Sequence, residues 1–452
     1  MKINRDLTQG DIKKQMTSLT FPMIFGILGM TIFNLVDTFF VGLIGTRELA
    51  ALSFTFPIVM TFSSLTLGIS TGVTAVVSKV AGRNEPEKLK SLVFDSMLLS
   101  LICVIFFIII GFIILRPVLG LMKAEQDLIP IIMQYMTIWL PGLVFVVFPM
   151  VGNGIIRALG DTRTPGIVML IASITNAVLD PLLIFGIGPF PELGVPGAAL
   201  ATVFGRFITF VIALYVLMRR EKVLVMQKRT MSQMSGNWKE ILNIGLPDGL
   251  SRIILPIGSG IITGMVASYG VAAVAGYGIA TKMENFILII TMALSSVIVP
   301  FAGQNIGAGN PGRVRKIFKY SNVFSLILQT ALYLVILPLA AVLAGLFSDD
   351  PAVIGTTALY LRIVALGLGF KGIILMSSAL LNVMRRPYVA AAINLGQMFA
   401  IFVPLAYLGN RLLGLAGIFA ALLISLVVSA GAAWGIAMRR LGRLQEKAGE
   451  SA

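Results

Sequence analysis

The chain has 452 residues, of which 57% are hydrophobic and only 12% are charged, and its 35 Lys and Arg outnumber its 20 Asp and Glu. It contains no histidine, which excludes histidine acid–base catalysis and histidine-ligated metals, and its single cysteine excludes an intramolecular disulfide. This composition is typical of a membrane protein.

Apolar stretches of about 20 residues, the length that a membrane-spanning helix needs, follow one another along the whole chain. Backbone groups in lipid must be satisfied within their own segment, so these continuous runs predict helices. The first run is too long for the core of a signal peptide and lacks a cleavage pattern after it, so we expect a retained helix. The predicted spans are 17–43, 51–77, 92–115, 129–151, 166–188, 195–218, 241–266, 275–300, 318–345, 353–378, 389–409 and 413–438.

The basic residues lie at the N-terminus and in alternate loops rather than in one surface patch. Lys and Arg recur at 79–90, 157–163, 219–239, 313–319, 385–386 and 439–447, whereas the other loops carry only Arg47, Arg116, Lys123 and Arg411. By the positive-inside rule, both termini are cytoplasmic and the chain is a multi-pass protein of the plasma (inner) membrane. The net charge of +15 therefore reports topology, and we expect no nucleic-acid partner.

Two parts of the chain repeat one another. When Pro22 is aligned with Pro247, Gly45-Thr-Arg-Glu-Leu-Ala50 falls opposite Gly270-Val-Ala-Ala-Val-Ala275; later, Pro165 pairs with Pro387 and Leu193-Gly-Val-Pro-Gly197 pairs with Leu413-Gly-Leu-Ala-Gly417. Six spans per half is an even number, so both halves insert in the same orientation, as in many secondary transporters. We predict a six-helix bundle at 1–218, a cytoplasmic linker at 219–240, a second six-helix bundle at 241–438 and a basic cytoplasmic tail at 439–452.

Two carboxylates lie inside predicted spans of the first half, Asp37 in the apolar run 21–43 and Asp180 in the run 166–188. A carboxylate at membrane depth costs roughly 2.5–3.5 kcal/mol on insertion scales, so it usually faces a cavity, a partner or a proton rather than lipid. The matching positions of the second half are Ile262 and, approximately, Phe402. The repeated scaffold therefore does not require the two acids, whereas a site built in one half does.

Counted along their helices, Asp37 and Asp180 lie at similar depths in the outer half of the membrane. Asn176 is one turn before Asp180 on the same helix face, and Thr202 lies about seven residues into the following span. If spans 1, 5 and 6 are neighbours, these four residues form one oxygen-rich layer that binds protons or a sodium ion. The alternative is a hydrogen-bonded cluster that only ties the helices together.

Four motifs resemble the multidrug and toxic compound extrusion (MATE) family, in particular its DNA-damage-inducible-F-like and archaeal branch. They are Phe33-Asn-Leu-Val-Asp37, Gly152-Asn-Gly-Ile-Ile-Arg-Ala-Leu-Gly-Asp161, Asn176-Ala-Val-Leu-Asp-Pro181 and Gln304-Asn-Ile-Gly-Ala-Gly309, and the resemblance covers nearly the whole chain. It implies an all-α membrane protein with twelve transmembrane helices in a V-shaped pair of pseudo-symmetric six-helix bundles. It also implies export of organic cations and other amphipathic compounds by antiport with protons or sodium ions, by a monomer in lipid that has no cofactor and is not an enzyme.

In this branch the N-terminal bundle holds the cation or proton site, and the matching residues here are Asp37, Asn176, Asp180 and Thr202. Sodium at these four residues is the only metal that the resemblance implies. Pro22 matches a proline of span 1 that permits helix bending.

A substrate cavity is also implied, and Asn153 matches one of its positions. We take Met30, Phe33, Asn34 and Glu284 as further candidates for this cavity. Phe33 departs from relatives that carry a tyrosine one turn before the aspartate, so the hydrogen-bond network of this chain differs from theirs.

Other charges inside predicted spans have two interpretations. Arg206, Lys282, Glu284 and Lys371 either line the cavity or form compensating ion pairs and reach the membrane surface with their charged ends. Asp95 lies near the inner end of span 3, where we expect interfacial water to solvate it.

Two other functions remain as alternatives. A lipid-linked precursor flippase of the same superfamily would have a strongly cationic cavity and usually extra spans. An intramembrane polyprenyl transferase would need closely spaced D-x-x-x-D patterns, which the sequence lacks. No G-x-x-x-x-G-K-[ST] loop occurs either, so we expect an ion gradient rather than ATP to supply the energy.

Overall fold

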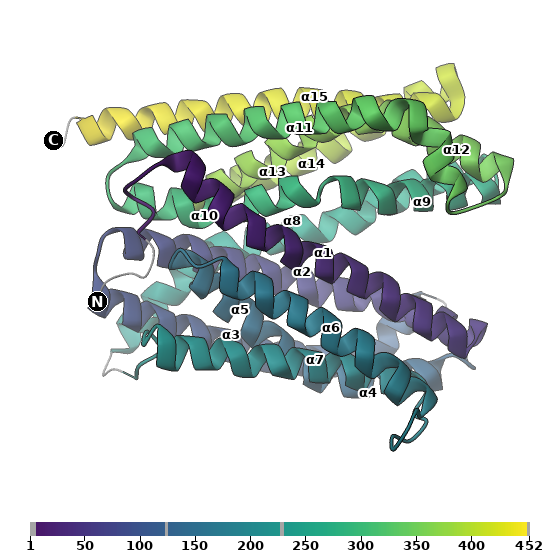
Figure 1. Cartoon of the computed structure of the whole chain (residues 1–452), viewed down its shortest axis with the longest axis horizontal. Coiled ribbons are helices and arrows are strands. Elements are labelled where there is room, and N and C mark those ends of the chain that lie inside the picture. Colours follow the sequence, from purple (N-terminus) through teal and green to yellow (C-terminus); the bar gives the residue numbers. More distant parts are fainter. Residues whose placement is uncertain (1–5, 123–124, 227–229, 450–452) are drawn as a thin grey trace. The chain divides into compact units, whose positions relative to one another are not determined.

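The computed structural model describes residues 6–122, 125–226 and 230–449, except for the side chains of residues 34, 35, 37–39, 42, 46, 49, 255 and 447–449. Every regular element in this part of the chain is a helix (Figure 1). Because many of these helices are long and apolar enough to cross a membrane, the prediction of an all-α membrane protein is confirmed. The chain divides into unit 1 (Met1–Leu7 and Ser18–Gly249) and unit 2 (Thr8–Thr17 and Leu250–Ala452).

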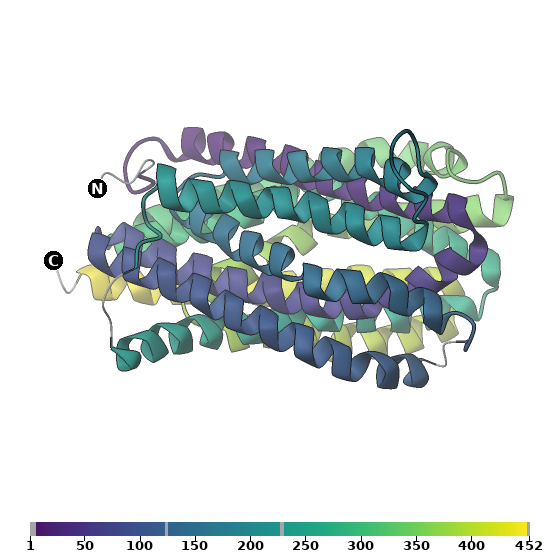
Figure 2. The same cartoon turned by 90° about the horizontal axis from the view of Figure 1, so that it is seen from below.

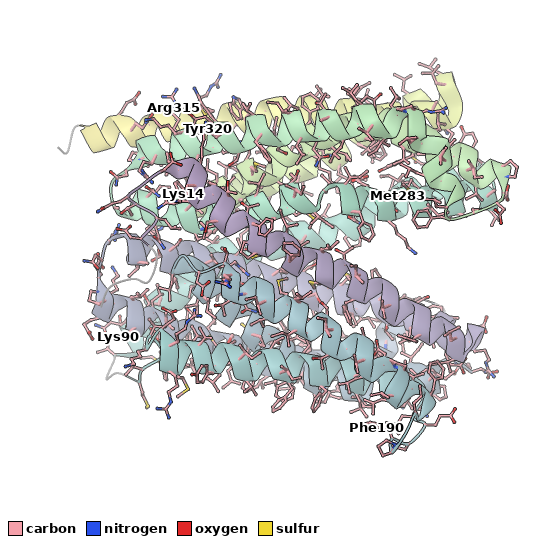
Figure 3. All side chains as sticks on the ribbon, in the orientation of Figure 1. Lys14, Lys90, Phe190, Met283, Arg315 and Tyr320 are labelled. Atoms are coloured by element: carbon pink, nitrogen blue, oxygen red, sulfur yellow. The ribbon has the colours of Figure 1, made fainter. Side chains whose placement is uncertain are left out.

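Unit 1 contains most of the first helix, the next six and the start of the eighth. They are α1 (Ile12–Ile44), α2 (Thr46–Gly82), α3 (Pro86–Leu121), α4 (Ile129–Gly142), α5 (Val144–Ala158), α6 (Arg163–Phe185), α7 (Val195–Tyr215) with the π-helical turn η1 (Val216–Arg220), and α8 (Met231–Ala267). Helices α6 and α7 lie side by side in both views (Figures 1 and 2). Lys90, near the start of α3, and Phe190, in the loop after α6, lie at opposite ends of the unit (Figure 3).

Unit 2 contains α8 from Leu250 onward and the remaining helices. They are α9 (Val271–Ile287), α10 (Ile289–Gly307), α11 (Pro311–Gly345), α12 (Pro351–Val364), η2 (Ala365–Gly367), α13 (Leu368–Val383), α14 (Pro387–Leu395), η3 (Gly396–Phe402) and α15 (Val403–Gly449). The segment Thr8–Thr17 packs here because the Nη1 of Arg313 donates to the carbonyl of Gly10 at 2.9 Å and the ammonium of Lys13 lies 5.2 Å from the ring centre of Tyr320. Lys14, Arg315 and Tyr320 accordingly lie near one end of the unit (Figure 3).

The described helices account for twelve crossings. Ten are long and apolar enough to span a membrane, and the pair α4–α5, bent by 41°, forms an eleventh. The last of the ten, Pro387–Glu446, has 60 residues, about 90 Å of helix and far more than one bilayer needs. At Gly414 the backbone leaves the helix (φ 59°, ψ −138°). The backbones of Gly409 and Gly417, on either side of this break, lie so close that a methyl on Gly417 would be 1.9 Å from the carbonyl oxygen of Gly409. The chain therefore folds back on itself at Gly414. This segment is therefore two crossings.

The internal repeat is visible in backbone geometry. Gly194 (φ 60°, ψ −131°) and Gly414 (φ 59°, ψ −138°), which the sequence pairs, share a conformation that only glycine adopts without strain. Helices α3 and α11 begin at Pro86 and Pro311, the same interval that separates Pro22 from Pro247. Matching turns at matching positions support a duplicated bundle.

The boundary between the units differs from the predicted linker at 219–240. Helix α8 begins inside that linker, where Thr230 and Gln233 cap each other's backbone N–H groups at 3.3 and 3.4 Å, and it stays with unit 1 as far as Gly249. Asp95 of α3 holds it: its Oδ2 accepts from Asn237 at 2.7 Å and its carbonyl accepts from the indole of Trp238 at 2.9 Å. Asp95 is 0% exposed, so the prediction that interfacial water solvates it was wrong.

Candidate functional site

Helices α1 and α6 cross through glycines. A methyl on Gly166 would lie 2.4 Å from the carbonyl oxygen of Pro22, and one on Gly26 would lie 2.9 Å from the Cα of Gly166. Glycine at both positions lets the two backbones touch, which larger residues would prevent. One turn further along α1, Gly29 faces the side chain of Leu170 on α6. The crossing therefore fixes how the following turns of α1 and α6 face each other.

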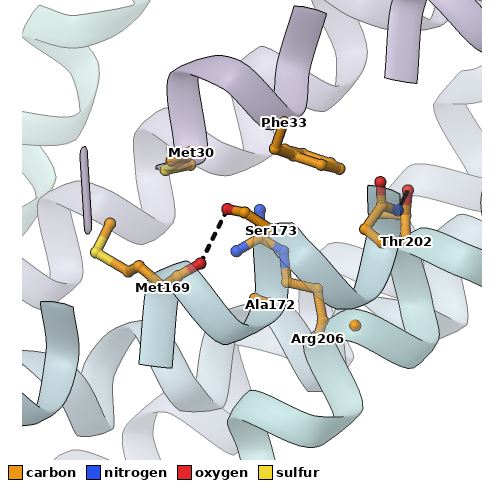
Figure 4. Close-up of a pocket in the computed structure, with 9 residues that line it drawn as sticks. Met30, Phe33, Met169, Ala172, Ser173, Thr202 and Arg206 are labelled. Carbon is orange, nitrogen blue, oxygen red and sulfur yellow. Dashed lines mark hydrogen bonds between the residues drawn. The ribbon is translucent and has the colours of Figure 1, made fainter. Parts of the chain in front are cut away.

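Beyond the crossing, α1, α6 and α7 line a small, partly open pocket. Phe33 faces Ser173 and Arg206 across it, and the hydroxyl of Ser173 donates to the carbonyl of Met169 at 2.9 Å (Figure 4). The lining residues are Met30, Phe33, Met169, Ala172, Ser173, Asn176, Thr202, Gly205 and Arg206. Five residues singled out from the sequence thus line one pocket: Met30, Phe33, Asn176, Thr202 and Arg206.

Asn176 and Asp180 lie one turn apart on α6, and both are buried, at 2% and 0% exposure. In one orientation of the Asn176 amide, its nitrogen donates to Asp180 Oδ2 at 2.7 Å and its oxygen accepts from the backbone N–H of Thr202 at 3.1 Å. In the other orientation the nitrogen donates to Thr202 Oγ1 at 3.3 Å. Only the first orientation joins Asp180 on α6 to Thr202 on α7, because in the second the amide oxygen faces the carboxylate, which is also an acceptor.

The first orientation gives both ends of the amide a partner of the right kind. The amide nitrogen, a donor, faces a carboxylate oxygen, and the amide oxygen, an acceptor, faces a backbone N–H. Asn176 therefore joins the buried carboxyl of Asp180 to the neighbouring helix α7.

Arg206 places a fixed positive charge in the same pocket. It lies one turn after Thr202 on α7, and its guanidinium stacks on the ring of Phe33, 6.0 Å from the ring centre. No carboxylate among the described residues forms an ion pair with it. Of the two interpretations of this residue, lining of a cavity is the one the structure supports.

The side chains of Asp37 and Asn34 lie outside the described residues, although α1 is helical through both positions. Phe33, one turn before Asp37, lines the pocket, and Phe40, one turn after it, lies 6.4 Å from the ring of Phe185 on α6. Position 37 therefore lies along the stretch of α6 that carries Asn176 and Asp180. The meeting of the two acids stays a prediction, as does the hinge role of Pro22.

Asn153 and Glu284 are not among the residues that line this pocket. Asn153, on α5, is 9% exposed, and its Oδ1 has no hydrogen-bond partner among the described residues. Glu284 belongs to unit 2, where it is 7% exposed, accepts from the hydroxyl of Tyr360 through Oε2 and pairs with Lys371 through Oε1. For Glu284 and Lys371 the compensating ion pair is thus the correct interpretation.

The sequence alone did not identify Ser173 and Met169 as pocket residues. Both lie on the α6 face that also carries Asn176, so the helical period from Asn176 back through Ser173 to Met169 was an available signal. In the described part of the chain, no three His, Cys, Asp or Glu residues cluster as a metal site would require. Oxygens of Asp180, Asn176 and Thr202 are the available ligands for a monovalent cation in unit 1.

Comparison with known proteins gives consistent matches. The family profile described as MatE matches residues 22–182 and 247–408, so each match begins at one of the paired prolines. A Shewanella oneidensis protein named FAD transporter is 36% identical over 97% of this chain and 97% of its own. The probable multidrug resistance protein YpnP of Bacillus subtilis is 27% identical over 95% of each chain. The crystal structure of the Vibrio cholerae MATE transporter VcmN in the bent form superposes with a TM-score of 0.89 at 29% identity, covering 95% of this chain and 97% of that chain.

Proposed function

The chain belongs to the MatE family of transporters, and on that premise we propose that it is a secondary active exporter of amphipathic organic compounds. Protons or sodium ions that flow inward drive the export. The chain is a transporter and not an enzyme, in keeping with relatives that match it over 93–97% of their length and are named as transporters or export proteins. The absence of a phosphate-binding loop from the sequence favours an ion gradient over ATP.

The observation that carries the proposal is the fully buried carboxyl of Asp180, which the amide of Asn176 joins to Thr202 on the neighbouring helix. A proton that binds Asp180 neutralises it and weakens the hydrogen bond that the amide donates to it, so the link between α6 and α7 changes with the charge of Asp180. A sodium ion would neutralise the same layer by binding the oxygens of Asp180, Asn176 and Thr202. We assign Asp37 to this layer as well, and we assign Pro22 as the point where α1 bends in response.

Exchange of cargo for cation follows if the binding of each weakens the binding of the other. If the bound cation reshapes the pocket between α1, α6 and α7 so that it holds cargo less well, then bound cargo must weaken cation binding by the same factor. Cargo and cation then alternate on the two sides of the membrane. We place the chain in the plasma membrane as a monomer in lipid, with both termini cytoplasmic, because most of its Lys and Arg lie in the loops on that side.

Two kinds of cargo are candidates. Organic cations are the class that the sequence resemblance implies, and relatives that are 24–27% identical to this chain are named as multidrug proteins. A flavin dinucleotide is suggested by the Shewanella oneidensis relative at 36% identity, whose name specifies FAD. A lipid-linked precursor is the alternative cargo that would make the chain a flippase.

Dye efflux from reconstituted vesicles tests the proposal. Wild-type protein should export a cationic dye or FAD when a pH gradient or a sodium gradient is imposed separately, and the gradient that works identifies the coupling ion. Asp180→Asn and Asp37→Asn should abolish gradient-driven efflux at normal protein abundance.

Asp127→Asn is the matched control, because the side chain of Asp127 is 81% exposed in a loop. This variant should transport like the wild type. Wild-type rates from Asp180→Asn would rule out coupling through this layer. Movement of lipid-linked precursors without efflux of either soluble probe would favour the flippase.

A further inference from the structure

Helix α9 of unit 2 carries small and polar residues on part of its exposed face. Ala275, Gly278, Lys282 and Asn285 recur at intervals of three and four residues and so form one stripe, and all four are at least partly exposed. Two exposed apolar residues, Val271 and Phe286, lie at its ends. A methyl on Gly278 would meet nothing within 4 Å, so open space adjoins this stripe. By contrast, α11 exposes large apolar side chains, among them Val323, Phe324, Ile327, Leu334 and Val335.

The depth of Lys282 makes the contrast informative. It lies inside the predicted span 275–300, about 10 Å along the helix from Ala275. An ammonium group at that depth is costly in lipid and is found facing water or a partner. Lys282 has neither a hydrogen bond nor an ion pair with any described residue. It must therefore face water.

The nearest acid does not neutralise this charge. Glu284 follows two residues later, which turns it toward the opposite side of α9, where Tyr360 and Lys371 already bind both of its oxygens. No other Asp or Glu occurs in the membrane-spanning helices of unit 2 between Leu250 and Gly435. Lys282 is thus an uncompensated cation, and the amide of Asn285, one turn away on the same stripe, offers neutral hydrogen-bond donors.

We propose that Lys282 binds an anionic group of the exported compound, a phosphate or a carboxylate, with Asn285 as the adjacent hydrogen-bond donor. The inference rests on the proposed function, since it names the cargo chemistry of an exporter. It assigns the chain to amphipathic anions rather than to organic cations. An ammonium group is a strong donor to phosphate and carboxylate oxygens and would repel a cationic cargo.

Arg362 provides a matched control. It is also exposed and lies at a similar distance into its helix, α12, counted from Pro351. Its helix face carries Leu359 and Leu366 as neighbours, so it lacks the small and polar surroundings of Lys282. Removal of its charge should leave anion binding unchanged.

Binding of flavins to the purified protein tests the inference without requiring transport. Flavin mononucleotide and riboflavin share a ring system and differ by one phosphate, so the ratio of their affinities isolates the anion contact. Wild-type protein should prefer the phosphorylated flavin by at least about tenfold, the factor that one charge-assisted contact of about 1.4 kcal/mol gives. Lys282→Gln should remove that preference, while Lys282→Arg and Arg362→Gln should keep it.

Four results would overturn the inference. It fails if wild-type protein binds both flavins equally, or if Lys282→Gln keeps the preference. It also fails if Lys282→Gln weakens riboflavin as much as the phosphorylated form, because Lys282 is then only structural. If the preference depends on Lys282 only in vesicles with anionic phosphatidylglycerol and vanishes in neutral phosphatidylcholine, the contact is to a lipid headgroup. Preferential binding without gradient-driven efflux would instead refute the proposed exporter and leave the anion site standing.

Discussion

The glycine crossing of α1 and α6 is tested most directly by Gly166→Ala. The added methyl would lie 2.4 Å from the carbonyl oxygen of Pro22 and 2.9 Å from the carbonyl carbon of the same residue. Both are backbone atoms and cannot rotate out of the way. The two helices must therefore separate by about 1 Å to reach an ordinary van der Waals distance.

The expected loss of stability combines two opposing terms. Overpacking costs about 1–3 kcal/mol, and a clash with backbone belongs at the upper end of that range. Alanine favours a helix over glycine by about 1 kcal/mol, which offsets part of the loss. A net loss of about 2 kcal/mol remains, and for a unit of this size it lowers Tm by roughly 4–8 °C.

Transport should fall further than stability. The displaced part of α1 continues directly to Met30 and Phe33, which line the pocket opposite Ser173 and Asn176. Thermal unfolding in detergent and gradient-driven efflux from vesicles measure the two effects separately. Gly431→Ala is the control, because Gly431 lies exposed on α15 with nothing within 4 Å of the added methyl. It should retain efflux and, through the helix preference of alanine alone, raise Tm slightly. Wild-type Tm together with wild-type efflux in Gly166→Ala would refute the role assigned to the crossing.

Three further predictions concern ionisable side chains. Burial raises the pKa of Asp161, but hydrogen bonds from Thr164 and the charge of Arg220 outweigh it and lower the pKa below 3.8. Ionised Asp161 therefore stabilises the folded state above pH 3.8, and this stabilisation is lost as pH falls through the lower pKa of the folded state. Asp161→Asn should lower Tm at pH 7 and make the fall of Tm with decreasing pH less steep. Lys371→Gln leaves the buried carboxylate of Glu284 without its cation and should lower the free energy of unfolding by about 2 kcal/mol. This is less than the roughly 3–5 kcal/mol lost when a fully buried pair is broken, because Lys371 is 37% exposed. Adding Glu284→Gln to this variant should recover most of the lost Tm. Asp95→Ala removes the acceptor of Asn237 and should cost about 1–3 kcal/mol in the same unfolding measurement.

Features that depend on the local sequence could be predicted. Gly194 and Gly414 stand at matching places in the repeat, and their matching backbone angles follow because only glycine occupies that region readily. The apolar runs likewise predict the crossings, since their length is fixed by the bilayer. The breaks at Leu143 and Leu288, which divide single predicted spans into α4–α5 and α9–α10, could not be read from hydropathy because both halves are apolar.

Features that depend on contacts distant in sequence could not be predicted. The burial of Asp95 requires Asn237 and Trp238, which the sequence places in a polar stretch that reads as a linker. The pairing of Glu284 with Lys371 and the stacking of Arg206 on Phe33 likewise join different helices. The sequence shows that a charged side chain inside a span must be paired or solvated. It does not show which residue of another helix is the partner.

The repeat gives independent support for the acidic layer of unit 1. By the intervals that relate paired prolines and glycines, the positions matching Asp37, Asn176, Asp180 and Thr202 in unit 2 are Ile262, Met398, Phe402 and Leu422. Ile262 and Phe402 belong to one buried apolar cluster, and Met398 and Leu422 pack against it. The second copy of the fold therefore brings these four positions into one neighbourhood, which supports the prediction that Asp37 meets Asp180 in the first.

The same comparison separates stability from function at this layer. Full burial of a large apolar side chain stabilises a fold by about 1.5–3 kcal/mol, whereas a buried carboxyl must first lose its water. A bundle that needed only to be stable would use the apolar cluster in both units, as unit 2 does with Ile262 and Phe402. Unit 1 instead keeps Asp180, with the amide of Asn176 between it and Thr202 of the neighbouring helix. This layer is less stable than an apolar one, but its charge can change. Such a layer is useful only if the change of charge alters the contact between α6 and α7, and ion-coupled export requires a step of that kind.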